Sequence, residues 1–389
     1  MSAHKALAEA LVDCVSNPDR GWSTGVMQAL VAADPNLEQF AAVAGWHRCD
    51  GAAWLAVKDA SLADTTGGRE LADRYVAGVG RHLRSLSDLG LICEALAASE
   101  IPFVVFKGPV VAEQLYNKAG LRFYGDVDIL VAPSTFARSI EALEGRGCVV
   151  LDANWTMLTD VVAGQIHLAT PLGTVIDLHW NVVNEHALRK VFPIPTQALL
   201  DRSTTVDVRG NCLPTLDPVD TLVHLCLHAS MAGANRLGWL KDVERAGSAS
   251  PQWLEVVART REWGAGSAVG VALARSRHAL AAPVPAPVLA QLTGGPGWRA
   301  LTKTVDRLAP VSRVHDHGSV NRIVARAARS TGRASTLELG RRAVGWARDG
   351  GPFAGEHDPW KLTDSRDPRA AIFPSGDRAT YVSVVERQT

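Results

Sequence analysis

Two aspartates, Asp126 and Asp128, stand one residue apart in the otherwise apolar segment 126–131 (DVDILV). Side chains two positions apart on a β-strand point to the same face, so the two carboxylates converge while Val127 and Ile129 point into a core. Two carboxylates this close repel one another unless a cation lies between them. Such an oxygen pair suits Mg²⁺, which binds one or two protein carboxylates together with substrate phosphates. The pair therefore indicates metal-dependent chemistry on phosphate.

A third acid, Asp177, lies in a second alternating segment, residues 175–180 (VIDLHW), where it shares a face with His179. Residues 164–170 (GQIHLAT) precede it, and the turn residues at 171–174 predict a β-hairpin between the two segments. If the Asp177 strand lies beside the strand with the acidic pair, three carboxylates meet at one edge. Three carboxylates suffice to hold two Mg²⁺ ions for in-line displacement at phosphorus.

The first strand of this hairpin carries two further polar residues, Gln165 and His167. Both face the three acids in one hairpin register and point away from them in the other, because a slip of one residue reverses every side chain. The sequence leaves this register open.

Another short apolar segment, residues 103–106, ends in a Lys107-Gly108 turn about twenty residues before the acidic pair. Pro109 follows directly and suits the first position of a helix. The order of Lys-Gly turn, paired acids and third acid is more specific than an acidic pair alone, because isolated acidic pairs are common on exposed strand edges.

Composition limits the class of protein. The chain has 389 residues, and its 40 basic and 40 acidic side chains leave no net charge, so the whole chain does not favour nucleic acid or an anionic membrane as a partner. No segment approaches 18 uninterrupted apolar residues, and the first residues lack the pattern of a signal peptide. We therefore expect a cytoplasmic protein without membrane contact. The six cysteines show no CxxC spacing and are expected to be free thiols.

Four regions follow from the distribution of turn and helix signals. We expect an N-terminal helical region over 1–100, an α/β core over 101–215, a C-terminal helical domain over 216–349 and a loosely ordered tail over 350–389. The expected fold class is α+β, with a small mixed β-sheet core flanked by helical regions.

Four motifs in this order resemble the uncharacterised bacterial nucleotidyltransferases of the DNA polymerase β-like superfamily. The motifs are RxxxDxDhLV at 122–131, hDLHW at 176–180, LCLHA at 225–229 and WLxD at 239–242, where h is an apolar residue. The resemblance extends over residues 82–250. It implies transfer of a nucleoside monophosphate from an NTP to a hydroxyl acceptor, either a small molecule or a modified peptide, with release of pyrophosphate.

The resemblance also implies roles for the three acids. Asp126 and Asp128 would ligate the metal, with two Mg²⁺ ions expected. Asp177 would be the third ligand and the general base that takes the proton of the acceptor hydroxyl.

Nucleotide contacts follow from the same resemblance. The Gly108 turn and the next helix would receive the triphosphate, and Lys107 would place a charge at its β- or γ-phosphate. The superfamily more often has Gly-Ser or Gly-Gly at this turn, so Lys-Gly departs from the general pattern. Arg122 would clamp phosphate, and His179 would orient the metal cluster or the acceptor. Independently of the resemblance, Lys241 or Arg236 on the probable helix around Trp239 is a further candidate for a phosphate contact.

Two alternatives remain open. The same pocket would also serve a non-catalytic protein that binds a nucleotide or a partner, or a toxin-like nucleotidyltransferase that acts on tRNA. Eight arginines lie between 313 and 348, and helical spacing predicts one basic face from four of them, Arg322, Arg326, Arg329 and Arg333. Such a face indicates either a contact with nucleic acid or an acidic substrate, or a solvated helix surface. Nucleic acid is thus a possible partner but not the favoured one.

Overall fold

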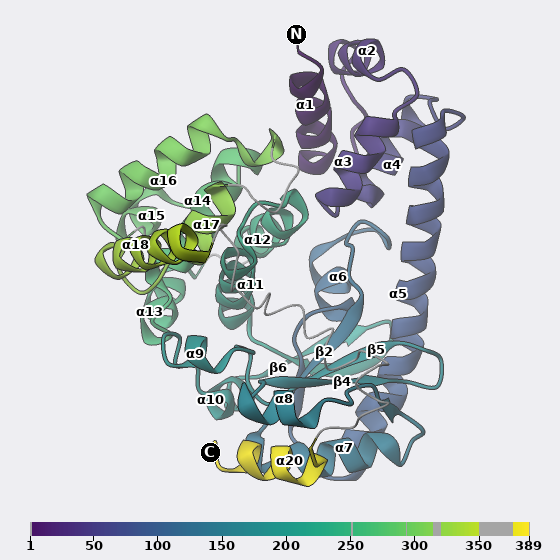
Figure 1. Ribbon diagram of the computed structural model, residues 1–389. Coiled ribbons are helices and arrows are strands. Elements are labelled where there is room, and N and C mark those ends of the chain that lie inside the picture. Colours follow the sequence, from purple (N-terminus) through teal and green to yellow (C-terminus); the bar gives the residue numbers. More distant parts are fainter. Residues whose placement is uncertain (1, 250–251, 293, 314–319, 350–375, 389) are drawn as a thin grey trace. The chain divides into compact units, whose positions relative to one another are not determined.

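The computed structural model describes residues 2–249, 252–292, 294–313, 320–349 and 376–388. Contacts between these residues divide the chain into two compact units. The helical unit comprises Met1–Gly80, Leu115–Phe123 and Pro218–Ala354, and the sheet unit comprises Arg81–Gln114, Tyr124–Asp217 and Gly355–Thr389. The long helix α5 (Thr66–Ala98), drawn in blue in Figure 1, contributes residues to both units.

A five-stranded mixed sheet forms the centre of the sheet unit. In spatial order its strands are β1 (Phe103–Val105), β2 (Asp126–Val131), β5 (Val175–His179), β4 (Gln165–Ala169) and β3 (Val149–Val150). Neighbouring strands are antiparallel except for β2 and β5, which run parallel. The expected small mixed sheet is therefore confirmed, and so is the expected hairpin between β4 and β5.

The two faces of this sheet differ in polarity because side chains alternate along each strand. Val127, Ile129 and Leu178 are fully buried on one face, in a core shared with α5 and with α7 (Phe136–Glu144). Burial of each large aliphatic side chain contributes about 1.5–3 kcal/mol, so this face fixes the orientation of β2 and β5. The acidic and histidine side chains consequently lie on the opposite face.

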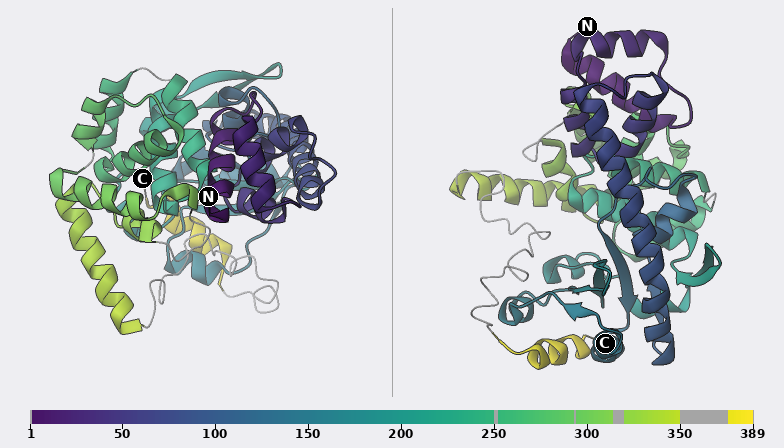
Figure 2. Two further views of the ribbon diagram at one scale, coloured as in Figure 1. Left: turned by 90° about the horizontal axis from the view of Figure 1, so that it is seen from above. Right: turned by 90° about the vertical axis from the view of Figure 1, so that its right-hand side faces the viewer.

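The end of the chain returns to this core. Helix α20 (Arg378–Glu386), yellow in Figure 1 and Figure 2, packs on α7 and on α8 (Trp155–Asp160). Its Tyr381 is fully buried. The sequence predicted a loosely ordered tail over 350–389. Residues 350–375 and 389 lie outside the described residues. Residues 378–386 form an ordered helix instead, because Tyr381 and Val385 on one face of it are buried.

A two-stranded sheet of β6 (Thr204–Val208) and β7 (Asn211–Thr215) was not predicted. Arg209 and Gly210 connect its strands with φ of 51° and 86°, the left-handed turn that matches the twist of a hairpin. Three short helices complete the sheet unit: α6 (Pro109–Leu115), which ends in the helical unit, α9 (His186–Arg189) and α10 (Thr196–Asp201).

The helical unit confirms that helical regions flank the sheet core. On the N-terminal side it contains α1 (Ala3–Ser16), α2 (Thr24–Ala33), α3 (Glu38–Trp46) and α4 (Asp50–Asp59). On the C-terminal side it contains α11 (Pro218–Ala232), α12 (Leu237–Ala249), α13 (Trp253–Glu262), α14 (Gly266–Leu280), α15 (Ala286–Leu292), α16 (Pro296–Leu308), α17 (Val320–Arg326) and α18 (Gly332–Asp349). Among the described residues, no helix combines the length and apolar character needed to cross a membrane.

The predicted single basic face is wrong. Helix α17 ends at Arg326 and α18 begins at Gly332, so the helical spacing is interrupted. Arg322, Arg326 and Arg329 are buried. Arg329 also pairs with Glu338 at 2.7 Å, so this region does not present a row of solvated arginines.

Candidate metal and active site

Parallel pairing of β2 with β5 brings the acidic residues of the two strands together. Asp128 lies opposite Asp177, and Leu130 lies opposite His179. One ligand atom each from Asp128, Asp177 and His179 lies within 4.8 Å of the others, and all three residues are buried. Asp126 shares their face of the sheet, is half-buried, and lies outside this close group. The adjacency of the two strands, on which the predicted site depends, is therefore present.

Asp128 is held in its charged form by two neighbours. The Lys107 Nζ lies 2.6 Å from Asp128 Oδ1, and the His179 Nε2 lies 3.2 Å from the same oxygen. Burial alone raises the pKa of the Asp128 carboxyl, but the charge of Lys107 and the hydrogen bond with His179 outweigh it and lower this pKa below its ordinary value. Burial lowers the pKa of His179, so this imidazole is neutral and Nε2–H donates to Asp128.

The surroundings of Asp177 shift its pKa in the opposite direction from that of Asp128. Burial first, and then the charges of Asp126 and Asp128, raise the pKa of Asp177 to about 7, although His167 and Lys107 act against this rise. The Gln165 Nε2 donates to Asp177 Oδ2 at 2.8 Å. This carboxyl therefore takes up and releases a proton near neutral pH, as a general base must.

The hairpin register left open by the sequence directs Gln165 and His167 toward the acids. His167 pairs with Asp177 across β4 and β5, and its Nε2 lies 3.8 Å from Asp177 Oδ1. On its other side, its Nδ1 lies 3.1 Å from both oxygens of buried Asp152. Sequence reasoning missed Asp152, because it follows a two-residue strand and no spacing relates it to Asp177.

The Lys107-Gly108 turn packs directly on the acidic strand. Gly108 has a φ of +59°, and a Cβ at this position would lie 2.6 Å from the carbonyl oxygen of Asp126. Glycine is therefore required here both by its backbone conformation and by space. The predicted helix begins at Pro109, as expected.

The donor set fits a divalent cation. Two buried carboxylates and one neutral imidazole converge, and His179 Nδ1 is buried without a hydrogen-bond partner among the described residues. The carboxylates of Asp126, Asp128 and Asp177 share one face of the sheet with the ammonium of Lys107, so negative charge is in excess there, and a divalent cation would offset it. The predominance of oxygen donors is compatible with Mg²⁺.

Two predicted site residues belong to the helical unit. Arg122 Nε donates to both oxygens of Asp242, at 2.9 and 3.0 Å, and Tyr116 donates to the same carboxylate at 2.6 Å. Lys241 Nζ lies 2.7 Å from Glu244 Oε2. The RxxxD and WLxD motifs are thus connected by an ion pair between Arg122 and Asp242, which the sequence reasoning did not anticipate.

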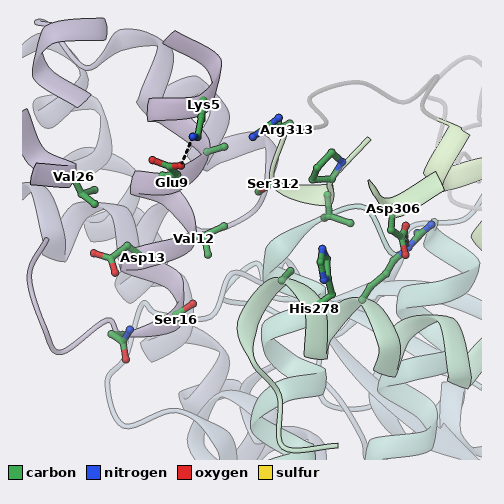
Figure 3. A pocket seen from close by; sticks show the side chains of 16 residues that line it. Lys5, Glu9, Val12, Asp13, Ser16, Val26, His278, Asp306, Ser312 and Arg313 are labelled. Carbon is green, nitrogen blue, oxygen red and sulfur yellow. Dashed lines mark hydrogen bonds and ion pairs between the residues drawn. The ribbon is translucent and has the colours of Figure 1, made fainter. Parts of the chain in front are cut away.

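A cavity of about 500 Å³ lies within the helical unit. Figure 3 shows its charged lining, with Lys5 and Glu9 of α1 paired on one side and His278 of α14 on the other. The residues that line it include none of those predicted for the site.

Comparison with known proteins agrees with this geometry. No curated protein matches the chain. A model of the family described as "uncharacterised nucleotidyltransferase" matches residues 33–281, more than half of the chain, including the acidic strands, the Lys-Gly turn and the WLxD helix. The chain therefore belongs to this family of uncharacterised nucleotidyltransferases.

Proposed function

We propose that this protein is a Mg²⁺-dependent nucleotidyltransferase that moves a nucleoside monophosphate from an NTP to a hydroxyl-bearing small molecule or modified peptide. The observation that carries the proposal is the buried group of Asp128, Asp177 and His179 on a sheet whose opposite face is a closed apolar core. Family membership supports nucleotidyl transfer in general. The electrostatics of the carboxylates supports the metal.

In the proposed reaction, the acceptor oxygen forms a bond to the α-phosphorus while the bond between the α-phosphorus and the bridging oxygen breaks. Pyrophosphate leaves with the electron pair of that bond. Bound Mg²⁺ would neutralise charge on the triphosphate and would be held by Asp126, Asp128 and Asp177. Asp177 would take the proton of the acceptor hydroxyl.

Three residues would support Asp177 in that role. Gln165 donates to one carboxylate oxygen, and His167 lies beside the other. Asp152 accepts from His167 Nδ1 and so holds the imidazole with its Nε2 toward Asp177. This arrangement fixes the direction of the carboxylate.

Lys107 would have two successive partners. Without substrate it neutralises Asp128 at 2.6 Å. When a cation occupies the carboxylates, the ammonium is available to a phosphate oxygen at the Gly108 turn, in line with the role expected from its position.

The test is pyrophosphate release from each NTP, with and without Mg²⁺, in the presence of a panel of hydroxyl acceptors. Asp128→Asn should lower turnover by about 10³-fold or more, because several kcal/mol of charge stabilisation depend on the metal ligands. Its melting temperature should fall, because Lys107 loses its buried ionic partner at 2.6 Å, so turnover is compared at a temperature at which both proteins are folded. Asp160→Asn, an exposed acid of the same unit, is the matched control and should retain full activity.

Equal turnover by Asp128→Asn and the wild type would refute the metal assignment. Two further experiments distinguish the proposed enzyme from the two alternatives: calorimetry with each NTP, and incubation of the protein with a radioactive NTP and total tRNA. Binding of an NTP without turnover across the acceptor panel would favour a non-catalytic binding protein, and labelling of total tRNA by a radioactive NTP would favour an enzyme that acts on tRNA.

A further inference from the structure

A buried histidine of α5, His82, connects two side chains from other parts of the sheet unit. Its Nδ1 lies 2.8 Å from the hydroxyl oxygen of Tyr124, and its Nε2 lies 2.7 Å from Oε1 of Glu113 on α6. His82 is 2% exposed and Tyr124 is 6% exposed, so both side chains are shielded from water. We call these three residues the histidine bridge. None of the three was predicted as a site residue.

Each ring nitrogen of His82 has one of these partners, and the partners define the direction of the hydrogen bonds. An ionised carboxylate only accepts, so Nε2–H donates to Glu113. Nδ1 of the neutral ring then accepts from the hydroxyl of Tyr124. Glu113 also lies 3.3 Å from Nε of Arg209, in the turn between β6 and β7. The imidazole is therefore fixed in one orientation, with a tyrosine on one side and a carboxylate on the other.

Tyr124 is also held through its backbone. Arg81, which precedes His82 in α5, donates from a guanidinium nitrogen to the carbonyl oxygen of Tyr124 at 3.2 Å. Two consecutive residues of one helix thus bind both the carbonyl and the hydroxyl of this tyrosine. The described residues 116–125 form neither a helix nor a strand, so no regular backbone ladder fixes this segment. Side-chain contacts such as those of Tyr124 must determine where the segment ends.

The histidine bridge lies at the entry to the acidic strand. Tyr124 is two residues before Asp126, the first residue of β2. Gly125, between them, has no side chain, and the space around it is open. At the other end of the bridge, Glu113 lies on α6, which begins directly after the Lys-Gly turn. The bridge therefore links the start of β2 to the helix that follows this turn.

We propose that His82 is a positioning residue for the metal site, which holds Tyr124 and thereby fixes the place of Asp126. This proposal rests on the proposed function, because the place of Asp126 matters only if this carboxylate ligates Mg²⁺. His82 would act through Tyr124 and the backbone, and not by contact with the ion. Removal of a residue that orients a metal ligand typically lowers metal affinity by about 10–100-fold.

Asp126 is the acid that most needs such support. It is half-buried at the start of its strand, whereas Asp128 and Asp177 are buried and lie opposite one another within paired strands. Mg²⁺ requires near-octahedral geometry with ligands at about 2.0–2.1 Å, so a small displacement of one carboxylate weakens its binding. Loss of the histidine bridge should therefore lower metal affinity even where the fold is kept.

The test measures the affinity of the full-length protein for Mn²⁺ alone, which suits the same carboxylate ligands and is followed by electron paramagnetic resonance. No NTP or acceptor is present, so the result does not depend on turnover. Tyr124→Phe removes one oxygen atom and keeps the ring, and His82→Phe removes both hydrogen bonds of the histidine. Each variant should bind Mn²⁺ about tenfold more weakly than the wild type. The double variant should bind no more weakly than His82→Phe, because its two changes break the same hydrogen bond.

The matched control is Thr170→Val. Thr170, directly after β4, donates to buried Asp88 of α5 at 2.7 Å, so this variant also removes a buried hydrogen bond to the same helix. It should lose stability but bind Mn²⁺ as the wild type does. All proteins are compared at a temperature at which they are folded.

Equal Mn²⁺ affinity in Tyr124→Phe, His82→Phe and the wild type would overturn the inference alone. An equal loss of affinity in Thr170→Val would overturn it as well, because that result would reflect general destabilisation. Failure of the wild type to bind Mn²⁺ would instead overturn the metal site on which the proposed function depends, and the inference with it. If His82→Phe does not fold, Tyr124→Phe decides, since it keeps the edge-to-face contact between the two rings.

Discussion

Asp177 combines burial with two neighbouring carboxylates, and both raise its pKa, to about 7. An unfolded aspartate titrates near 4. The folded protein therefore binds this proton more tightly, and the stability that results is present at low pH and is lost as pH rises from about 4 through about 7. A bound cation would remove this loss by favouring the ionised carboxylate.

We therefore expect Asp177→Asn to gain stability relative to the wild type as pH rises from 5 to 8 in EDTA, because the variant cannot acquire the repelling charge. Saturating Mg²⁺ should reduce this advantage by stabilising only the wild type. Melting temperatures of both proteins across this pH range, with EDTA and with Mg²⁺, provide the measurement. Parallel curves in EDTA would show that the charges around Asp177 are already compensated.

At the scale of elements, the Lys107-Gly108 turn and strand β2 are one packed structure. Gly108 has no room for a side chain because the carbonyl of Asp126 lies where a Cβ would go, at 2.6 Å. The position of the acidic strand consequently depends on a glycine that carries no functional group. At Gly125, the residue directly before β2, an added Cβ would have no atom within 4 Å.

Gly108→Ala should thus reduce stability by about 1–3 kcal/mol, since it adds backbone strain and a contact with Asp126. Activity should fall further than stability predicts, because β2 must shift. Gly125→Ala is the matched control, and we expect it to change neither quantity. Urea unfolding and pyrophosphate release test this pair, and similar behaviour of the two variants would argue against close packing at the turn.

At the scale of the whole molecule, the last described helix completes the core of the sheet unit. Tyr381 of α20 donates to the carbonyl of Ala163 at 2.6 Å and contacts Phe136 and Trp155 through its ring. Arg378 makes two hydrogen bonds to Glu144, at 2.7 and 2.9 Å. The sheet therefore depends on residues about two hundred positions away in the chain.

Tyr381→Ala should destabilise the sheet unit by about 3–5 kcal/mol, the range for deleting a buried aromatic side chain. The exposed neighbour Ser383→Ala should stay within about 0.5 kcal/mol of the wild type. Denaturant unfolding of both variants measures the difference. Equal stability would mean that α20 is dispensable for the core.

Short-range patterns in the sequence predicted much of this protein. Alternation in the DVDILV and VIDLHW segments places acids on one face and apolar residues on the other, and the hairpin and the start of α6 at Pro109 were predicted by their turn residues. These features depend on neighbours within a few residues, so a single chain segment contains the information. The family resemblance rested on the same segments.

Contacts between distant segments were decided by tertiary structure. The hairpin register turned His167 toward Asp177 and gave it Asp152 as a partner, and the pairing of Arg122 with Asp242 joined two motifs 120 residues apart. Arginine spacing over 322–333 predicted one basic face, but the end of α17 broke it. Strand pairing and packing depend on the sum of contacts over the folded chain, whereas residue spacing reports only which side chains share a face of one element.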